Sequence, residues 1–334
     1  MVRVLIAAIV AMAISLLAGP KFIEFLRRNE VGQQIREEGP AGHVTKQGTP
    51  VLGGLLILVS ATIAFLALSK YTVPALTVLF VTLGCGAIGF LDDLIKLRHR
   101  RSLGLSGRWK LVLLGLITVG VGAAARHQDL PTEVYVPGVG NLQLWWAWYG
   151  LLFLVIAGAA NGVNLTDGLD GLAAGTGIIA LFTFAAINAT AWIRSGPPGS
   201  RFDTKLDLAI IGAALMGGAI GFLWYNAFPA EVIMGDTGAM AIGGGLGAFA
   251  IMTKTIFLLL LIGGIFLVEA LSVMIQVFTF KYWGRRIFLM APIHHHFEMK
   301  AWSETKIMVR FWIVTGILCA SGFALYYRYF RGFR

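Results

Sequence analysis

Residues 73–90 are Val-Pro-Ala-Leu-Thr-Val-Leu-Phe-Val-Thr-Leu-Gly-Cys-Gly-Ala-Ile-Gly-Phe, and Leu91, Asp92 and Asp93 follow directly. The run holds no charged residue, and a helix of about 17–25 apolar residues crosses the ~30 Å hydrocarbon core of a bilayer. Acids beside hydrocarbon are costly unless they have a partner or a function. The stretch therefore predicts a membrane helix whose end carries polar chemistry.

The rest of the 334-residue chain has the same character. Hydrophobic residues make up 57% of it and charged residues 13%, with a mean hydropathy of +0.78, whereas soluble domains carry about 25% charged residues. This excludes an ordinary soluble enzyme, a disordered chain and a disulfide-rich secreted module. Cys85 and Cys319 lie inside apolar runs and indicate neither a disulfide nor a cysteine metal site. The net charge of +10 is not arranged as a basic face interleaved with aromatic residues, so no nucleic-acid partner is expected.

Ten apolar runs predict an all-α polytopic membrane protein with a single domain over residues 1–334. The first run is not expected to be a cleaved signal peptide, because Arg3 is the single cation at its start and three cations, Lys21, Arg27 and Arg28, follow it. The ten runs are Val2–Gly19, Val51–Ser69, Val73–Phe90, Leu111–Ala125, Leu144–Ala160, Gly171–Ile193, Ala209–Trp224, Gly238–Thr253, Ile256–Phe278 and Ile307–Tyr326.

Charge predicts the orientation. The five segments after odd-numbered runs hold 16 of the 27 Lys and Arg residues, and positive charge favours the cytoplasmic side of a membrane. The same five segments hold nearly all the unusual polar motifs, while the opposite connections are bland. We therefore expect both termini on the outer side and an active site on the cytoplasmic face.

Asp92 and Asp93 are the first candidate site residues. Adjacent residues of a helix point about 100° apart, so the two carboxylates cannot face one ion in the same way. We expect one to meet a metal or accept a proton, and the other to pair with Lys96 or a helix end. The alternative is a pair of solvated charges at the membrane boundary.

Asn161, Asn164, Asp167 and Asp170 recur at every third position. A turn of 3₁₀-helix would align them, or they serve more than one contact. Carboxylate and amide oxygens suit a hard cation such as Mg²⁺, whereas helix capping would explain one or two of the four. Asp236, between two glycines, is a further candidate acid or helix cap.

His294, His295 and His296 are consecutive, so they cannot easily converge on one zinc ion. Phosphate binding or proton transfer is the favoured interpretation. Cations that could hold a pyrophosphate lie in the same set of segments, namely Lys46, Lys110, Arg285 and Arg286. The inventory fits a phosphoryl reaction at a membrane surface with one lipid-borne substrate.

Four motifs, between about Gly39 and Trp312, carry a family resemblance. The motifs Gly89-Phe-Leu-Asp-Asp, Asn161-Gly-Val-Asn-Leu-Thr-Asp-Gly-Leu-Asp-Gly and Met234-Gly-Asp-Thr-Gly resemble those of the polyprenyl-phosphate N-acetylhexosamine-1-phosphate transferases. Met290-Ala-Pro-Ile-His-His-His-Phe-Glu is similar to the phospho-N-acetylmuramoyl-pentapeptide branch. The resemblance implies ten membrane helices in the bacterial cytoplasmic membrane, a Mg²⁺ cofactor, and transfer from UDP-N-acetylmuramoyl-pentapeptide to undecaprenyl phosphate. The products would be UMP and lipid I, the first lipid-linked peptidoglycan precursor.

The resemblance also implies roles for single residues. Asp92 would be the base or nucleophile with Asp93 beside it, and Asp236 would bind Mg²⁺, with Asn164 a weaker candidate. His294 would join the catalytic set. The remaining candidates would line the substrate pocket: Lys46, Lys110, Asn161, Asp167, Asp170, Asn226, Ile233, Gln276, His295 and His296.

Several alternatives stay open. A sibling transferase with a UDP-N-acetylglucosamine-type donor is disfavoured by the triple histidine, and an ion-coupled transporter by acids placed at span ends rather than at the membrane midplane. Glu269, deep in the ninth run, is the exception. Val51 and Ile233 depart from the family, which commonly has Thr and Phe at these places. A homodimer is neither required nor excluded.

Overall fold

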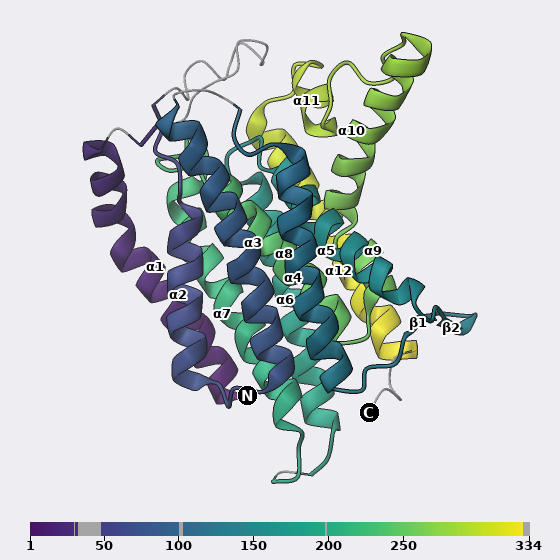
Figure 1. Cartoon of the computed structure of the whole chain (residues 1–334). Helices are drawn as coiled ribbons and strands as arrows, with labels where there is room; N and C mark the ends of the chain where they lie inside the picture. The colour runs from purple at the N-terminus through teal and green to yellow at the C-terminus, as the bar shows by residue number, and fades with distance from the viewer. Residues whose placement is uncertain (30, 33–47, 100–102, 198, 330–334) are drawn as a thin grey trace.

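A computed structural model describes residues 1–29, 31–32, 48–99, 103–197 and 199–329. In these residues the chain forms a bundle of α-helices with one short hairpin (Figure 1). The helices are α1 (Val2–Arg28), α2 (Gly54–Leu68), α3 (Val73–Arg98), α4 (Gly107–His127), α5 (Ala147–Thr166), α6 (Leu172–Arg194), α7 (Asp203–Asn226), α8 (Gly235–Met252), α9 (Ile256–Ile262), α10 (Gly264–Trp283), α11 (Ile293–Glu298) and α12 (Glu304–Tyr329).

Eight of these helices are long and apolar enough to cross a membrane, namely α1, α3, α4, α5, α6, α7, α10 and α12. The chain is therefore an all-helical, multi-pass membrane protein in its main architecture. Each of the ten predicted runs falls on one or more helices. Two of them fall on α2, an apolar helix of 15 residues, and α8, which is enclosed by its neighbours.

The ninth predicted run, Ile256–Phe278, is wrong as a single helix. The structure ends α9 at Ile262 and starts α10 at Gly264. Two adjacent glycines, Gly263 and Gly264, stand at the break, and glycine is a poor helix former because its backbone has the most freedom to lose. Beyond the break, α10 leans away from the bundle (Figure 1).

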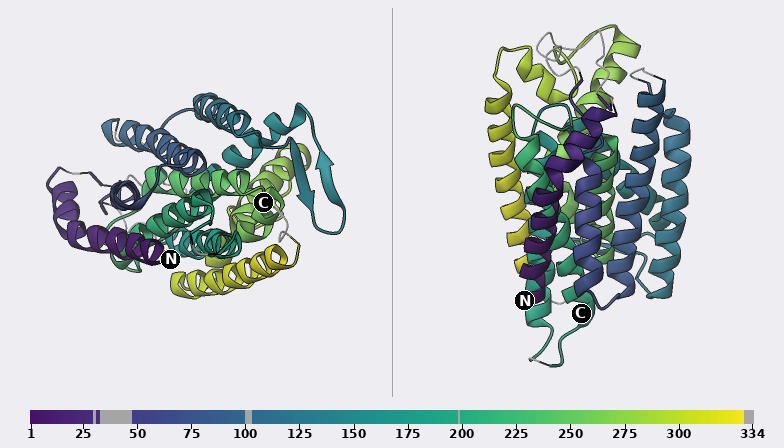
Figure 2. Two further views of the ribbon diagram at one scale, coloured as in Figure 1. Left: turned by 90° about the horizontal axis from the view of Figure 1, so that it is seen from below. Right: turned by 90° about the vertical axis from the view of Figure 1, so that its left-hand side faces the viewer.

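The helical architecture carries one addition that the sequence analysis does not predict. Strands β1 (Glu133–Val136) and β2 (Gly140–Gln143) form an antiparallel hairpin between α4 and α5. Strand-favouring Val134 and Tyr135 precede a turn in which Gly138 takes a φ of +83°, a conformation open to glycine at no steric cost. The hairpin projects to one side of the bundle (Figure 2).

Helix α8 lies inside the bundle, packed by α2, α3, α5, α6 and α9. All its residues from Thr237 to Met252 are buried. Glycines let its neighbours approach: a Cβ added at Gly89 of α3 would lie 2.1 Å from the Asp236 carbonyl oxygen, and one at Gly54 of α2 would lie 2.2 Å from the Gly238 nitrogen. Small residues at such contacts are typical of membrane helix packing, and here they bring the end of α3 against the start of α8.

The two ends of the bundle differ. The start of α1 and the end of α12 lie at one end, and the connections after α3, α5 and α7 lie at the other, which we call the motif end (Figures 1 and 2). This separation is the one that the charge count predicts. Which side of a membrane each end faces stays a prediction.

Candidate active site

Asp93 joins α3 to the first turn of α8. Its buried carboxylate accepts hydrogen bonds from the backbone N–H groups of Asp236 at 3.1 Å and Thr237 at 2.9 Å, and from the Thr237 hydroxyl at 2.7 Å. The first N–H groups of a helix have no partner within it, so an acid at this place stabilises the helix start. Asp93 thereby fixes the position of Asp236.

Asp92 points another way, as adjacent helical residues must. Its carboxylate is 1% exposed and accepts a hydrogen bond from the Leu105 backbone N–H at 2.6 Å. The Lys96 and Lys110 ammonium groups lie 2.6 Å and 3.1 Å from its oxygens. Of the two partners that the sequence analysis names for one acid of the pair, each acid takes one: Asp92 pairs with Lys96, and Asp93 binds the start of α8. That one of them meets a metal or accepts a proton stays a prediction.

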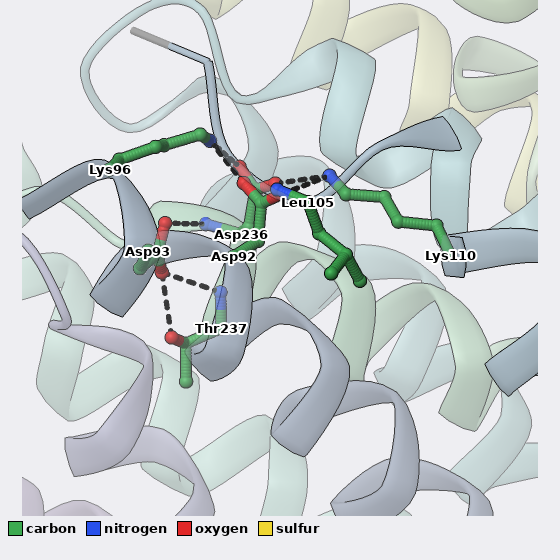
Figure 3. A network of polar contacts seen from close by, with 7 residues as sticks. All are labelled: Asp92, Asp93, Lys96, Leu105, Lys110, Asp236 and Thr237. Carbon is green, nitrogen blue, oxygen red and sulfur yellow. Dashed lines mark hydrogen bonds and ion pairs between the residues drawn. The ribbon is translucent and has the colours of Figure 1, made fainter. Parts of the chain in front are cut away.

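Asp236 faces the same two lysines. Lys96 Nζ is 3.0 Å and Lys110 Nζ 2.8 Å from its carboxylate oxygens. Figure 3 shows the two side chains reaching the carboxylates of Asp92 and Asp236 from opposite sides. Helices α3, α4 and α8 thus each supply charge to one cluster.

The donor set of this cluster fits a hard divalent cation. One oxygen from each of Asp92, Asp93 and Asp236 lies within 4.8 Å of the others, and oxygen ligands are those that Mg²⁺ prefers. The Asp93 oxygens are engaged by the start of α8. Those of Asp236 face the ammonium groups of Lys96 and Lys110, whereas Asp92 Oδ1 also accepts the Leu105 backbone N–H. Asp236 is therefore the carboxylate best placed to hold a metal, and Asp92 lies across the same two ammonium groups from it.

Asp167 lies near these acids, in the connection between α5 and α6. Burial raises its pKa to about 8, and the negative charges of Asp236, Asp93 and Asp170 act in the same direction. Asp170 has a different part: its Oδ2 accepts a hydrogen bond from the Ala230 backbone N–H at 3.0 Å, which ties two connections together.

Asn161 and Asn164 belong to α5 itself. Asn161 donates a hydrogen bond to the carbonyl of Ala157 in the same helix at 2.7 Å, and Asn164 is partly buried two residues before the helix ends. The four regularly spaced polar residues therefore serve several contacts, as one of the two sequence interpretations has it.

Asn226 and Gln276, both expected in the substrate pocket, hold backbone instead. Asn226 is buried; it accepts from Gly171 N–H at 3.0 Å and donates to the Val232 carbonyl at 2.9 Å. Both ends of the Gln276 amide are bonded to the backbone of Ile287 and Phe288. Each side chain stabilises a connection at the motif end.

The three histidines have separate partners. His294 is fully buried, with its Nδ1 3.1 Å from Glu269 Oε1. His295 is paired with Glu298, and His296 Nδ1 accepts a hydrogen bond from the Leu289 backbone N–H at 3.1 Å. Burial, together with the charge of Lys300, lowers the pKa of His296.

Ile233 is partly buried, and its backbone exchanges hydrogen bonds with Pro50 at 2.8 Å and Gly53 at 2.9 Å. Val51, the other departure from the family, is buried. Lys46 lies outside the described residues.

Three contact residues are absent from the predicted site: Leu105, Thr237 and Glu269. Lys96 is expected only as a partner of an acid, and its place four residues after Asp92 on a helix fits that ion pair. Leu105 acts through its backbone, which no side-chain pattern can report. Glu269 is linked to His294 across 25 positions of sequence, so only the fold reveals the pair.

Known proteins resemble this chain over nearly its whole length. The model of glycosyl transferase family 4 matches residues 75–254. Phospho-N-acetylmuramoyl-pentapeptide-transferases from Rubrobacter xylanophilus and Frankia alni are 46% and 43% identical to it, with 98% of each chain covered. The protein of that name from Bacillus subtilis is 42% identical, with 95% of each chain covered. The chain belongs to the phospho-N-acetylmuramoyl-pentapeptide-transferase family.

Proposed function

We propose that this protein moves phospho-N-acetylmuramoyl-pentapeptide from its uridine diphosphate carrier to undecaprenyl phosphate, forming lipid I and UMP. One observation carries the proposal. In a chain whose relatives bear this transferase name, α3, α4 and α8 bring three carboxylates and two ammonium groups together at one end of a membrane bundle. Charged groups of both signs at the edge of an apolar bundle suit a reaction between a lipid-borne phosphate and a water-soluble pyrophosphate.

The reaction balances as a phosphoryl transfer. A phosphate oxygen of the lipid forms a bond to the sugar-bearing phosphorus of the donor. The bond from that phosphorus to the bridging oxygen breaks, and UMP leaves with the electron pair. Both reactants are anionic, so cations that offset their charge in the transition state are the main requirement.

The acids divide this work. Asp236 would hold Mg²⁺, with Asn164 of α5 as a second ligand, and the ion would offset charge on the pyrophosphate. Asp92 faces the attacking lipid phosphate, as its base or nucleophile. Asp93 keeps both in place through the start of α8.

The remaining candidates bind or frame the donor. Lys110, Asp167, Ile233, His295 and His296 lie on α4 or on the connections at the motif end, from which a nucleotide-sugar can be reached without crossing the bundle. Lys46 is assigned to the same pocket. Asn161, Asp170, Asn226 and Gln276 shape it by holding backbone. His294 contributes through its buried pair with Glu269.

The membrane arrangement completes the proposal. Helices α2 and α8 cross the bilayer with the eight longer apolar helices, giving ten crossings in which α9 and α10 form one broken span. Both termini face outward, and the motif end faces the cytoplasm of a bacterial inner membrane, where the soluble donor is made. The 334 residues act as one domain.

A direct test uses purified protein in detergent with undecaprenyl phosphate and a radiolabelled donor. Label should enter the lipid phase only with a divalent cation present, and UMP should appear in equal amount. A matched reaction with UDP-N-acetylglucosamine should give no labelled lipid. Equal use of both donors would assign the chain to a different branch of the superfamily.

A further inference from the structure

Two lysines engage every oxygen of one carboxylate pair. Lys96 Nζ lies 2.6 Å from Asp92 Oδ2 and 3.0 Å from Asp236 Oδ1. Lys110 Nζ lies 3.1 Å from Asp92 Oδ1 and 2.8 Å from Asp236 Oδ2. Each ammonium group therefore bridges the same two acids, one of α3 and one of α8. A cation that binds any of these four oxygens must compete with a lysine.

Repulsion between the buried carboxylates requires cations close to them. Asp92 is 1% exposed and the Asp236 side chain 13% exposed, so water screens their mutual repulsion poorly. Asp93 adds a third carboxylate within reach. Two ammonium groups offset two of these charges and keep the acids together without a metal.

The form of the lysine side chain allows the cations to leave. An ammonium is a compact charge on a four-carbon stem, without the fixed fork by which arginine grips a carboxylate. Lys96 and Lys110 side chains keep 29% and 16% of their surface exposed, so part of each side chain reaches the surface of the bundle. They can swing away while α3, α4 and α8 stay in place.

We propose that Lys96 and Lys110 are exchangeable internal counter-ions. They pair with Asp92 and Asp236 in the absence of a divalent cation, and when a divalent cation binds these acids, the lysines move to the donor's phosphates. The inference rests on the proposed function, since it takes the metal site and the anionic donor from it. Its new content is a coupling between the two ligands. A lysine released by the metal becomes a partner for phosphate, so metal and nucleotide should raise each other's affinity, and the two effects must be equal.

The experiment measures Mn²⁺ binding by electron paramagnetic resonance on the full protein in detergent, without turnover. Lys96→Met removes a competitor, so Mn²⁺ should bind several-fold tighter than in the wild type. Lys96→Arg keeps the charge and grips carboxylates more firmly, so Mn²⁺ should bind more weakly. Lys281→Met is the matched control: this exposed lysine of α10 lies over the ring of Tyr282, and its loss should change nothing.

A second reading uses UMP as the probe. UMP should tighten Mn²⁺ binding in the wild type, and the gain should shrink several-fold in Lys96→Met. Lys110→Met provides an independent variant with the same expected signs if Lys96→Met does not fold.

The possible outcomes distinguish failure of the counter-ion exchange from failure of the metal site on which it rests. Weaker or unchanged Mn²⁺ binding in folded Lys96→Met and Lys110→Met, with binding abolished by Asp236→Asn, would overturn the counter-ion exchange and leave the metal site standing. Mn²⁺ binding that Asp236→Asn does not alter would overturn both this inference and the metal assignment.

Discussion

Buried acids lie at both ends of the helix bundle, and their partners differ. At the end opposite the motifs, Asp207 of α7 is fully buried and accepts hydrogen bonds from the backbone N–H groups of Lys70 and Thr72, each at 2.9 Å, and from the Ser69 hydroxyl at 3.1 Å. At the motif end, Asp92 and Asp236 face lysine ammonium groups. Backbone donors cannot move without unfolding the turn between α2 and α3, whereas ammonium groups on long stems can.

Two kinds of buried acid can be distinguished by their partners. An acid whose oxygens accept hydrogen bonds from backbone N–H groups fixes a turn or a helix end, as Asp207 and Asp93 do. An acid whose oxygens face side-chain cations keeps ligand capacity that a substrate or metal can use. On this basis Asp207 has a structural role and Asp236 a functional one. Asp93 supports function indirectly, because it holds the start of α8 on which Asp236 lies.

The largest expected effect tests the functional side of the comparison. Asp236→Asn keeps the size of the side chain but removes the charge that would hold the cation, and loss of one such group typically costs about 100-fold or more in turnover. Transfer of labelled donor to lipid at saturating Mg²⁺ measures the loss. The thermal unfolding temperature should stay close to that of the wild type. Normal turnover in this variant would remove Asp236 from the metal site.

The structural side is tested by Asp207→Ala. Two backbone N–H groups and a hydroxyl lose a buried acceptor, so the free energy of unfolding should fall by about 3 kcal/mol. Transfer activity per folded molecule should not change. Asp203→Ala is the matched control in the same helix, because Asp203 pairs with Lys70 at the surface; this variant should lose less than about 1 kcal/mol. Equal losses would mean that the backbone contacts of Asp207 add nothing.

A third, smaller effect concerns Asp167, whose carboxylate has a backbone hydrogen bond with Gly235 and three other acids near it. Its pKa of about 8 in the folded protein lies above the ordinary value of about 4 for an unfolded chain. The folded state therefore holds a proton that the unfolded state has lost, and the contribution of Asp167 to stability falls as pH rises from about 4 to about 8. Asp167→Asn should remove this slope and raise the unfolding temperature by a few degrees near pH 8.

Unfolding scans of both proteins across this pH range, with a chelator present, measure the difference. A chelator is needed because a bound divalent cation would itself stabilise the carboxylate. Parallel curves for the wild type and the variant would show that Asp167 is ionised in the folded protein throughout the range.

The smallest expected effect is a change in UMP affinity, and it concerns Ile233 at the motif end. Ile233 stands where the family commonly has Phe, and an aromatic ring stacked on a base is worth roughly 1–3 kcal/mol in nucleic-acid sites. Ile233→Phe should therefore tighten UMP binding several-fold and leave the Mg²⁺ dependence as it is. Calorimetric titration of UMP against both proteins gives the result. Equal affinities in two active proteins would mean that residue 233 only packs between segments.

Much of the architecture is legible in the sequence, because uncharged apolar runs report membrane helices directly. The exceptions have local causes. Gly263 and Gly264 break the ninth run although its hydrophobicity is continuous, and the hairpin after α4 has strands of only four residues each. The gathering of the motifs at one end of the bundle could also be predicted, because successive connections between membrane helices lie at alternate ends and the motifs lie in every second connection.

The candidate site is harder to read from sequence, because the role of a polar side chain depends on its partner. Asn226 and Gln276 have the chemistry of ligand-binding amides, yet backbone groups distant in sequence occupy them. Glu269 and His294 could be placed together only by folding. The divergence of Asp92 and Asp93, by contrast, follows from helix geometry alone and needs no tertiary information.

The enclosure of α8 has a consequence for how the chain enters a membrane. Nearly all of α8 is covered by other helices. It is also rich in glycine, and it is not among the helices apolar enough by composition to cross a bilayer. A segment of this kind gains little by partitioning into lipid alone, since glycine leaves backbone polar groups exposed to hydrocarbon. We therefore expect insertion to be ordered: the insertion machinery retains α8 until α3, α5 and α6 have assembled a protein-lined place for it. Asp236 would then reach its lysine partners only after α3 and α4 are in place.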